Sequence, residues 1–278
     1  MARAGLIQLT SSDDPAANLP VTRRLIAEAA AQGADLILTP EVTNCVSASQ
    51  TRQAEVLQFE PDDITLTALR EDAAALGKWI VIGSLGLKSD DPDGRFVNRS
   101  FLIAPDGSIA AWYDKIHMFD VAINETETYR ESAGYRPGDR AVLADTDVGK
   151  IGLTICYDVR FPALHRRLAQ AGAQILTGPA AFSPVTGAAH WHSLLRARAI
   201  ETGCYVFAPA QCGTHETSRG KQRRTYGHSL AVAPWGEILA DGGEAPGVSM
   251  VDFDLAQVEA ARRKVPSLTH DRDFAGPE

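Results

Sequence analysis

Cysteine is scarce in this sequence, and four cysteines in a chain of 278 residues are too few for a disulfide scaffold. Long apolar runs are missing as well, because no stretch reaches the roughly 18 apolar residues that a membrane-spanning helix requires. The opening residues, "MARAGLIQLTSSDD", enter a strand pattern at once and show neither the apolar segment nor the cleavage site of a signal peptide. We therefore expect a cytoplasmic protein with reduced thiols and no membrane partner.

Positive charge is also in short supply. The chain has 27 Lys and Arg against 35 Asp and Glu, which gives a formal net charge of −8. This balance argues against nucleic acid as a partner. The densest basic run is "RGKQRR", Arg219–Arg224, which we interpret as a solvated loop. A role at a substrate entrance or a subunit contact is the alternative for this run.

Several familiar motifs are absent or incomplete. No Gly-x-Gly-x-x-Gly follows a strand and no P-loop is present, so nothing supports a nucleotide cofactor. Ser229 in "GHSLA" opens an apolar strand and lacks the strand, turn and helix of a serine-hydrolase elbow. Cys204, Cys212, His215 and His228 lack the spacing of metal ligands. We therefore predict no cofactor and no metal.

Strand and helix patterns alternate from end to end of the chain. The continuous apolar runs "DLILTPE" and "AQILTGPAA" predict strands of sheets covered on both faces, and "PDGS", "DVGK" and "PWGE" predict hairpin turns between antiparallel strands. Helices are predicted over residues 22–32, 63–77, 162–172, 188–203 and 255–265.

Neither a linker nor an internal repeat interrupts this alternation. Residues 118–140 lack clean periodicity, and a loop of that length in a compact domain is usually functional. Hydrophobic residues make up 45% of the chain and charged residues 22%, as in ordinary globular proteins. The pattern predicts one α/β domain over residues 1–278.

Three reactive side chains follow three predicted strands. Glu41 follows "DLILTP", Lys115 follows "IAAWYD", and Cys156 follows "KIGLTI". Because loops beyond the carboxyl ends of strands converge in α/β folds, the three groups can meet in one crevice. A thiol nucleophile needs a base for its proton and a cation for the oxyanion, which these groups supply. Taken singly, the cysteine is as well explained by core packing, and the other two by solvent exposure.

The segments "LTPEV", "WYDKIHMF" and "TICYDVRFP" resemble, in order and spacing, the three signature segments of the nitrilase superfamily of carbon–nitrogen hydrolases. The resemblance extends from "AGLIQLT" to "VPSLTHDRDF". It implies a four-layer α-β-β-α sandwich with two mixed sheets, a Glu–Lys–Cys triad at Glu41, Lys115 and Cys156, and a second glutamate at Glu131. "CYDVRFPAL" and "YGHSLAVAPWGE" most resemble the amidase branch that includes deaminated-glutathione amidase and ω-amidase.

The resemblance also implies how these residues act. Cys156 attacks the amide carbon, Glu41 transfers protons, and Glu131 positions Lys115 or the hydrolytic water. The backbone N–H of Tyr157, at a strand-to-helix turn, is expected to form an oxyanion hole together with Lys115. Lys115 and the start of the helix are also expected to favour the thiolate of Cys156.

Three further residues are candidates for substrate binding. Arg160 lies four residues beyond Cys156 and can clamp a substrate carboxylate if it points into the pocket; an ion pair with Asp158 is the alternative. Phe182 and Thr186, in "PAAFSPVTG", follow a strand end and are expected to wall the pocket, with plain loop packing as the alternative.

The predicted function is a thiol amidohydrolase that cleaves a linear, carboxylate-bearing amide through a cysteine thioester and releases ammonia. Deaminated glutathione is the leading substrate and 2-oxoglutaramate the second. An N-carbamoyl amine or amino-acid hydrolase of the same superfamily is one alternative, and a non-catalytic interaction module is another. The resemblance implies assembly as a homodimer or a higher homo-oligomer, with a small-molecule amide as the other partner.

Overall fold

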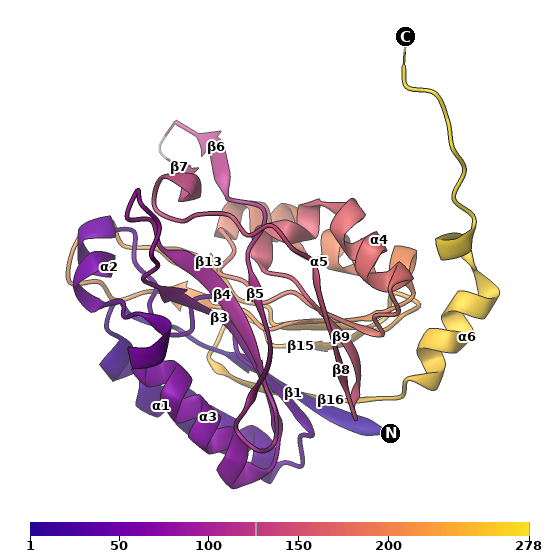
Figure 1. Ribbon diagram of the computed structural model, residues 1–278, viewed down its shortest axis with the longest axis horizontal. Helices are drawn as coiled ribbons and strands as arrows, with labels where there is room; N and C mark the ends of the chain where they lie inside the picture. Colours follow the sequence, from indigo (N-terminus) through magenta and orange to yellow (C-terminus); the bar gives the residue numbers. More distant parts are fainter. Residues whose placement is uncertain (126, 278) are drawn as a thin grey trace.

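A computed structural model describes residues 1–125 and 127–277 and shows two six-stranded sheets facing each other (Figure 1). The first sheet has the order β16 (Gly247–Phe253), β1 (Ala2–Gln8), β2 (Leu36–Leu38), β3 (Trp79–Leu87), β4 (Val97–Ile103) and β5 (Ile109–Asp114). The second has the order β15 (Ile238–Asp241), β14 (Leu230–Val232), β11 (Tyr205–Ala208), β10 (Ile175–Thr177), β9 (Gly149–Leu153) and β8 (Val142–Thr146).

Both sheets are mixed and repeat the same plan. In the first, β1, β2 and β3 run parallel, and the outer neighbours β16, β4 and β5 pair antiparallel. In the second, β9, β10 and β11 run parallel, while β8, β14 and β15 pair antiparallel. Because parallel strands need crossover connections, helices cover the outer face of each sheet.

The helices complete a four-layer sandwich. The first sheet is covered by α1 (Pro15–Ala31) and α3 (Ile64–Leu76), and the second by α4 (Pro162–Gln170) and α5 (Pro184–Thr202). The last helix, α6 (Ala256–Lys264), precedes an extended C-terminal segment that leads away from the body (Figure 1). The predicted α-β-β-α architecture is confirmed.

Strand β2 shows why the apolar runs are continuous. Leu36 and Leu38 pack into the core between the two sheets, and Ile37 packs on the other face, in the cluster formed with α1 and α3. All three side chains are fully buried. A strand covered on both faces has no position for a polar residue, so alternation disappears from its sequence.

The first helix begins seven residues before its predicted start at Thr22. Asp14 caps it by accepting hydrogen bonds from the backbone N–H groups of Ala16 and Ala17, and Pro15 occupies the first turn. Pro20 lies inside the helix, although proline normally disfavours that position. The cap and Pro15 define the start of this helix, and the loss of one N–H at Pro20 does not end it.

Residues 118–140, predicted as a loop, contain regular structure. They include a small hairpin, β6 (Asp120–Asn124) and β7 (Glu127–Arg130), followed by the 3-10 helix η2 (Glu131–Ala133). The prediction of a loop is therefore wrong. The hairpin forms its own two-stranded sheet outside the two large sheets.

The remaining elements are short. They are α2 (Gln50–Val56), β12 (Cys212–Thr214), β13 (Arg224–Tyr226) and the 3-10 helices η1 (Glu60–Asp62), η3 (Cys156–Arg160) and η4 (Ser267–Thr269). Helix α2, which the sequence did not predict, begins at Ser49, whose hydroxyl accepts a hydrogen bond from the N–H of Arg52. Within residues 1–125 and 127–277, no helix combines the length and apolar character needed to span a membrane.

Candidate active site

Glu41 lies three residues beyond the end of β2 and is almost fully buried. One carboxylate oxygen accepts the N–H of Ala181 at 2.8 Å, and the other accepts the amide of Asn98 at 2.9 Å. The next residue, Val42, has a positive φ of 47°, which is rare for a β-branched residue, and its N–H donates to the hydroxyl of Ser84. The backbone therefore holds the Glu41 carboxylate in one position at a local cost in strain.

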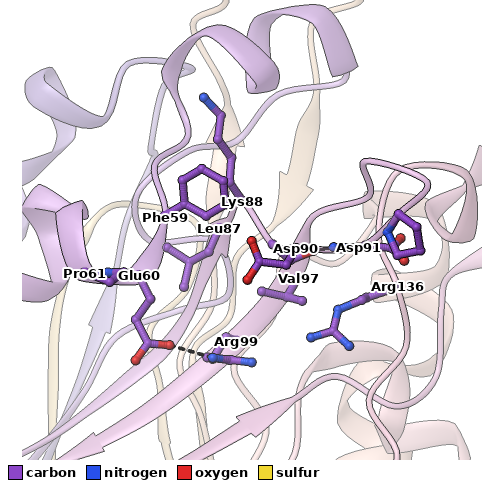
Figure 2. A pocket seen from close by; sticks show the side chains of 12 residues that line it. Phe59, Glu60, Pro61, Leu87, Lys88, Asp90, Asp91, Val97, Arg99 and Arg136 are labelled. Carbon is purple, nitrogen blue, oxygen red and sulfur yellow. Dashed lines mark hydrogen bonds and ion pairs between the residues drawn. The ribbon is translucent and has the colours of Figure 1, made fainter.

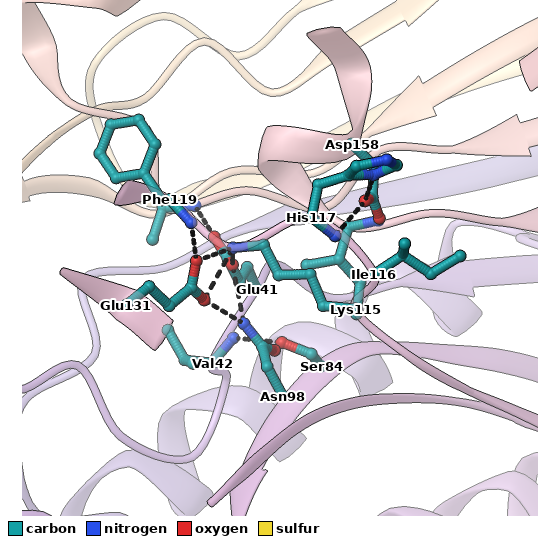
Figure 3. Close-up of polar contacts among 12 residues, drawn as sticks. Glu41, Val42, Ser84, Asn98, Lys115, Ile116, His117, Phe119, Glu131 and Asp158 are labelled. Carbon is teal, nitrogen blue, oxygen red and sulfur yellow. Dashed lines mark hydrogen bonds and ion pairs between the residues drawn. The ribbon is translucent and has the colours of Figure 1, made fainter. Parts of the chain in front are cut away.

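Lys115 follows β5 directly, and its ammonium lies between two carboxylates (Figure 3). Nζ is 2.9 Å from Glu41 Oε1 and 2.9 and 2.8 Å from the two oxygens of Glu131. The lysine side chain is only 2% exposed. All three ammonium hydrogens thus have acceptors, and the site is a buried cluster of one cation and two carboxylates.

The charges in this cluster stabilise one another. Burial alone would lower the pKa of Lys115, but Glu131 and Glu41 raise that pKa well above its ordinary value. Burial alone would raise the pKa of Glu41, but the charge and hydrogen bond of Lys115 lower it. At neutral pH the lysine is therefore charged and Glu41 is an ionised carboxylate.

Cys156 begins η3, three residues after β9, with a positive φ of 49°. Its own N–H donates to the carbonyl of Pro179 at 2.9 Å, and its thiol hydrogen bonds the carboxylate of Glu41. Burial and the nearby negative charge of Glu41 raise the pKa of this thiol well above its ordinary value, and Lys115 only partly opposes them. Lys115 lowers this pKa and so favours the thiolate, as expected, but burial and Glu41 outweigh it, and the thiol carries its proton at neutral pH.

Asp158 fixes the turn that carries Cys156. Its fully buried carboxylate accepts hydrogen bonds from the N–H of Ile155 at 2.9 Å and the hydroxyl of Tyr113 at 2.7 Å. It also accepts the N–H of His117 and lies 2.7 Å from the Nδ1 atom of that ring. Since Tyr113 belongs to β5 and His117 follows Lys115, this one carboxylate ties the cysteine turn to the lysine strand.

We expect Asp158→Ala to lower the free energy of unfolding by about 2–4 kcal/mol, because several buried donors lose their shared acceptor. Tyr113→Phe, which removes one of these bonds and leaves the carboxylate in place, is expected to cost about 1 kcal/mol. Urea denaturation of both variants measures the difference. Equal losses in the two variants would contradict the role assigned to the carboxylate.

The four residues Glu41, Lys115, Glu131 and Cys156 line one cavity of about 550 Å³, which we call the Cys156 cavity. Its wall also includes aromatic and basic side chains: Phe119, Tyr129, Tyr135, Phe182, Arg130, Lys221, Arg223 and Arg224. The structure therefore brings together the candidate nucleophile, base and cation from three separate strand ends. Residues 42–50 contribute mostly small and polar groups to the same wall.

Two of the three predicted substrate-binding side chains lie elsewhere. Phe182 lines the cavity, whereas Arg160 and Thr186 are not among its lining residues. The Arg160 guanidinium lies over the Phe182 ring, 5.5 Å from its centre, and 3.2 Å from the Nδ1 atom of His190. The alternative prediction, an ion pair between Arg160 and Asp158, is also wrong. Within the described residues Arg160 forms no ion pair with Asp158, whose carboxylate instead binds Tyr113, Ile155 and His117.

Two residues of the site were missed by sequence reasoning. Asn98, on β4, donates to Glu41 and more distantly to Glu131. It stands beside the polar residues Arg99 and Ser100 in that strand, so no local signal in the sequence singles it out. Arg223 belongs to the basic run that we interpreted as a solvated loop. Residues 221–224 line the Cys156 cavity, so the alternative, a place at the substrate entrance, fits the structure better.

A second hollow, of about 490 Å³, lies beside β4 and shares no lining residue with the Cys156 cavity (Figure 2). In it Arg99 bonds both oxygens of Asp114, at 2.7 and 2.8 Å, and one oxygen of Glu60 at 2.6 Å. Because Asp114 immediately precedes Lys115, this fork anchors the strand end that carries the lysine. The Arg99 guanidinium is occupied by these two carboxylates, so we assign Arg99 a structural role.

Comparison with known proteins identifies the family. The carbon–nitrogen hydrolase family matches residues 3–263. The chain belongs to this family. A deaminated glutathione amidase of Yersinia enterocolitica is 39% identical over 274 residues, which cover 98% of this chain and 93% of the relative.

Solved structures agree with this assignment. Saccharomyces cerevisiae Nit3, a member of branch 10 of the nitrilase superfamily, has a TM-score of 0.85 and 30% identity, with 98% of this chain and 97% of that chain covered. A mutant amidase from Nesterenkonia sp. AN1, whose active site cysteine carries the covalently added acetamide moiety of fluoroacetamide, has a TM-score of 0.76 and 27% identity, over 95% and 94% of the two chains. The predicted class of enzyme, an amidase of the nitrilase superfamily, is confirmed.

Proposed function

We propose that this carbon–nitrogen hydrolase cleaves deaminated glutathione, with 2-oxoglutaramate as the second candidate, and that residues 1–278 act as one catalytic domain. The observation that carries the proposal is the buried Glu41–Lys115–Glu131 cluster against the Cys156 thiol in one cavity. The name of the Yersinia relative supports the choice of substrate.

The ionisation states suggest how the reaction begins. Because the Cys156 thiol is protonated and Glu41 is ionised, Glu41 removes the thiol proton as the sulfur attacks the amide carbon. The developing oxyanion accepts hydrogen bonds from the Tyr157 N–H and from Lys115. Since all three ammonium hydrogens of Lys115 have acceptors, one of its bonds to Glu41 or Glu131 must break as the oxyanion forms.

The remaining steps return every group to its starting state. The C–N bond breaks as Glu41 gives the proton to the departing nitrogen, which leaves a thioester on Cys156. Glu41 then takes a proton from a water molecule that attacks the thioester, and the carboxylic acid product leaves as the thiol recovers its proton. Glu131 keeps Lys115 in place during both halves of the reaction.

The substrate determines which amine is released. The scissile amide of deaminated glutathione joins a 2-oxo acid to the cysteinyl-glycine amine, so its hydrolysis yields 2-oxoglutarate and cysteinyl-glycine. The predicted release of ammonia is therefore wrong for deaminated glutathione, because ammonia forms only from a primary amide such as 2-oxoglutaramate. Product analysis on these two compounds, an N-carbamoyl amino acid and an aliphatic nitrile tests the proposal; turnover of the N-carbamoyl compound alone would contradict it.

Arg223 is the best candidate for binding the substrate carboxylate, in place of Arg160. It lines the Cys156 cavity, one terminal nitrogen donates to the carbonyl of Ala181 at 3.2 Å, and its buried Nε atom has no hydrogen-bond partner within the described residues. A guanidinium with a free donor in a pocket can bind a carboxylate through parallel hydrogen bonds. Burial of an unsatisfied donor costs free energy, which such a ligand would recover.

We expect Arg223→Gln to raise KM for 2-oxoglutaramate about 10- to 100-fold with little change in kcat, since a charged hydrogen bond contributes roughly 1.5–3 kcal/mol. Hydrolysis of propionamide, which has no carboxylate, should change little. Arg219→Gln is the matched control, because Arg219 lies in the same basic run but pairs with Glu55 and does not line the cavity. An equal loss on both substrates would show that Arg223 supports the fold of the site instead.

We further propose a cytoplasmic location and assembly into a homodimer or higher homo-oligomer. The four cysteines are free, as expected in a reducing compartment. The extended C-terminal segment carries Phe274, which is 91% exposed, and Trp235 and Ile200 are each more than half exposed. Exposed apolar groups of this size are typical of subunit contacts, and sedimentation of the purified protein tests the assembly.

A further inference from the structure

Three side chains that take no part in the proposed reaction meet on the surface of the second sheet. They are His192 on α5, His228 in the turn between β13 and β14, and Asp241 at the end of β15. His192 Nε2 is 3.0 Å from one carboxylate oxygen of Asp241, and His228 Nδ1 is 2.9 Å from the other. One ligand atom of each lies within 4.8 Å of the other two.

The backbone holds His228 in an unusual conformation. Its φ is +56°, and only two other non-glycine residues in the described ranges have a positive φ: Val42 and Cys156, both in the candidate active site. The His228 carbonyl accepts a hydrogen bond from the indole of Trp191, and its N–H donates to the carbonyl of Gly243. The backbone of His228 is therefore fixed by hydrogen bonds of both its carbonyl and its N–H.

The elements that carry His192 and Asp241 are anchored as well. His192 follows Trp191, whose fully buried ring secures α5 against the sheet. Asp241 pairs with Leu230 of β14 across the hairpin, and its carboxylate also accepts the N–H of Gly243 at 2.9 Å. Three ligands on rigid elements are prearranged, so binding would cost little ordering of the chain.

We propose that His192, His228 and Asp241 form a binding site for a divalent transition metal of the zinc type. Two imidazole nitrogens and one carboxylate oxygen suit zinc, with a fourth position for water. Ligands about 2.0–2.1 Å from zinc in a tetrahedral site lie roughly 3.3 Å apart, and Asp241 Oδ2 is 3.0 Å from His192 Nε2 and 3.2 Å from His228 Nδ1, so only slight opening is needed. The three side chains are 32%, 21% and 33% exposed, which leaves a path for the ion.

Sequence spacing cannot reveal this site, because its ligands come from three separate elements. The other residues considered as metal ligands from the sequence have partners elsewhere. His215 bonds Ser11 and Thr225, Cys212 contacts Thr10, and Cys204 contacts Arg262. A bound ion would join α5 to the β14–β15 hairpin. The first residues of α5, Pro184 and Val185, line the Cys156 cavity, so the ion would stiffen one wall of the active site.

Calorimetric titration with Zn²⁺ tests this proposal. It is performed in the Cys156→Ala background, so that the active-site thiol does not compete for the metal. We expect one site of micromolar affinity and a rise of several degrees in the melting temperature at saturating Zn²⁺. Titration with Co²⁺ should give the visible absorption of a tetrahedral nitrogen and oxygen site, without the charge-transfer band of a thiolate ligand.

Two variants and one control test whether Zn²⁺ binds at these three residues. His192→Gln should weaken Zn²⁺ binding at least 100-fold, and His228→Asn should do the same while keeping the positive φ, which asparagine tolerates. His190→Gln, on the same helix but outside the cluster, should bind as the parent does. Absence of binding in the parent, or unchanged affinity in His192→Gln, would overturn the proposal. Circular dichroism establishes that each variant is folded.

Discussion

Cys156→Ala is expected to lower kcat/KM for deaminated glutathione by at least about 10⁴-fold, because it removes the proposed nucleophile and with it the thioester. The loss should fall on kcat, and substrate should still bind because Arg223 and the cavity wall remain. The change deletes a single sulfur atom at the wall of a cavity, from a residue that is 8% exposed. The fold should therefore be nearly unaffected. Release of cysteinyl-glycine under saturating substrate is the measurement.

Cys204→Ala is the matched control for this experiment. Its thiol is also buried, but it contacts the carbonyl of Ala173 and the guanidinium of Arg262, away from the Cys156 cavity. We expect full activity for this variant. Intact-mass spectrometry adds a direct readout, since an acyl adduct formed during turnover should appear on the native chain and be absent from Cys156→Ala. Turnover that survives in Cys156→Ala would exclude the thioester mechanism.

Lys115→Gln is expected to abolish activity and also to lower the free energy of unfolding by about 3–5 kcal/mol near pH 8. The ammonium is 2% exposed and neutralises the two carboxylates of Glu41 and Glu131. Removing one partner of a buried charge cluster leaves uncompensated charge in the interior, which costs far more than losing a surface ion pair. Urea denaturation of the native and variant proteins measures this difference.

The pH dependence of the same variant distinguishes electrostatics from packing. In the native protein Lys115 lowers the pKa of Glu41, so this group stabilises the fold above its unfolded pKa and less as the pH falls. Without the lysine, burial raises the pKa of Glu41, and the deficit grows as the pH rises through that raised value. We therefore expect a smaller difference between the two proteins at pH 5 than at pH 8.

A surface lysine provides the control for Lys115. Lys150 is 47% exposed and 3.8 Å from Asp145, and Lys150→Gln should change stability by less than about 0.5 kcal/mol at either pH. A deficit in Lys115→Gln that is independent of pH would show that lost packing, and not the buried charge, dominates.

The regular elements were largely predictable because their signals are local. The helix over 63–77 is observed as α3, with Asp63 as its N-cap and Gly77 in the left-handed C-cap. Apolar runs and turn residues likewise located the strands and hairpins of both sheets. The errors fall where tertiary context decides, as in α1, which continues past Pro20, and the β6–β7 hairpin, which lies outside the two sheets.

Side-chain direction was not predictable in the same way. Arg160 follows Cys156 by four residues and was a reasonable choice for a carboxylate clamp, yet η3 turns its guanidinium onto Phe182. Arg223, from a segment 67 residues beyond Cys156, lines the cavity because the chain returns to it after β12. A long-range return of this kind leaves no periodic trace in the sequence.

The sequence by itself determined the layered α/β fold, the class of enzyme and the residue types available at three strand ends. The alternation of strands and helices follows from hydrophobic periodicity and turn chemistry, which are encoded within a few residues of one another. The layers and the class of enzyme follow from the resemblance of three short segments to the nitrilase superfamily. Only the tertiary structure decided that Glu41 and Glu131 share one ammonium, that the Cys156 thiol keeps its proton, and that His192, His228 and Asp241 meet. Each of these depends on burial and on distances between remote segments, and a pKa or a ligand geometry exists only once those segments are packed together.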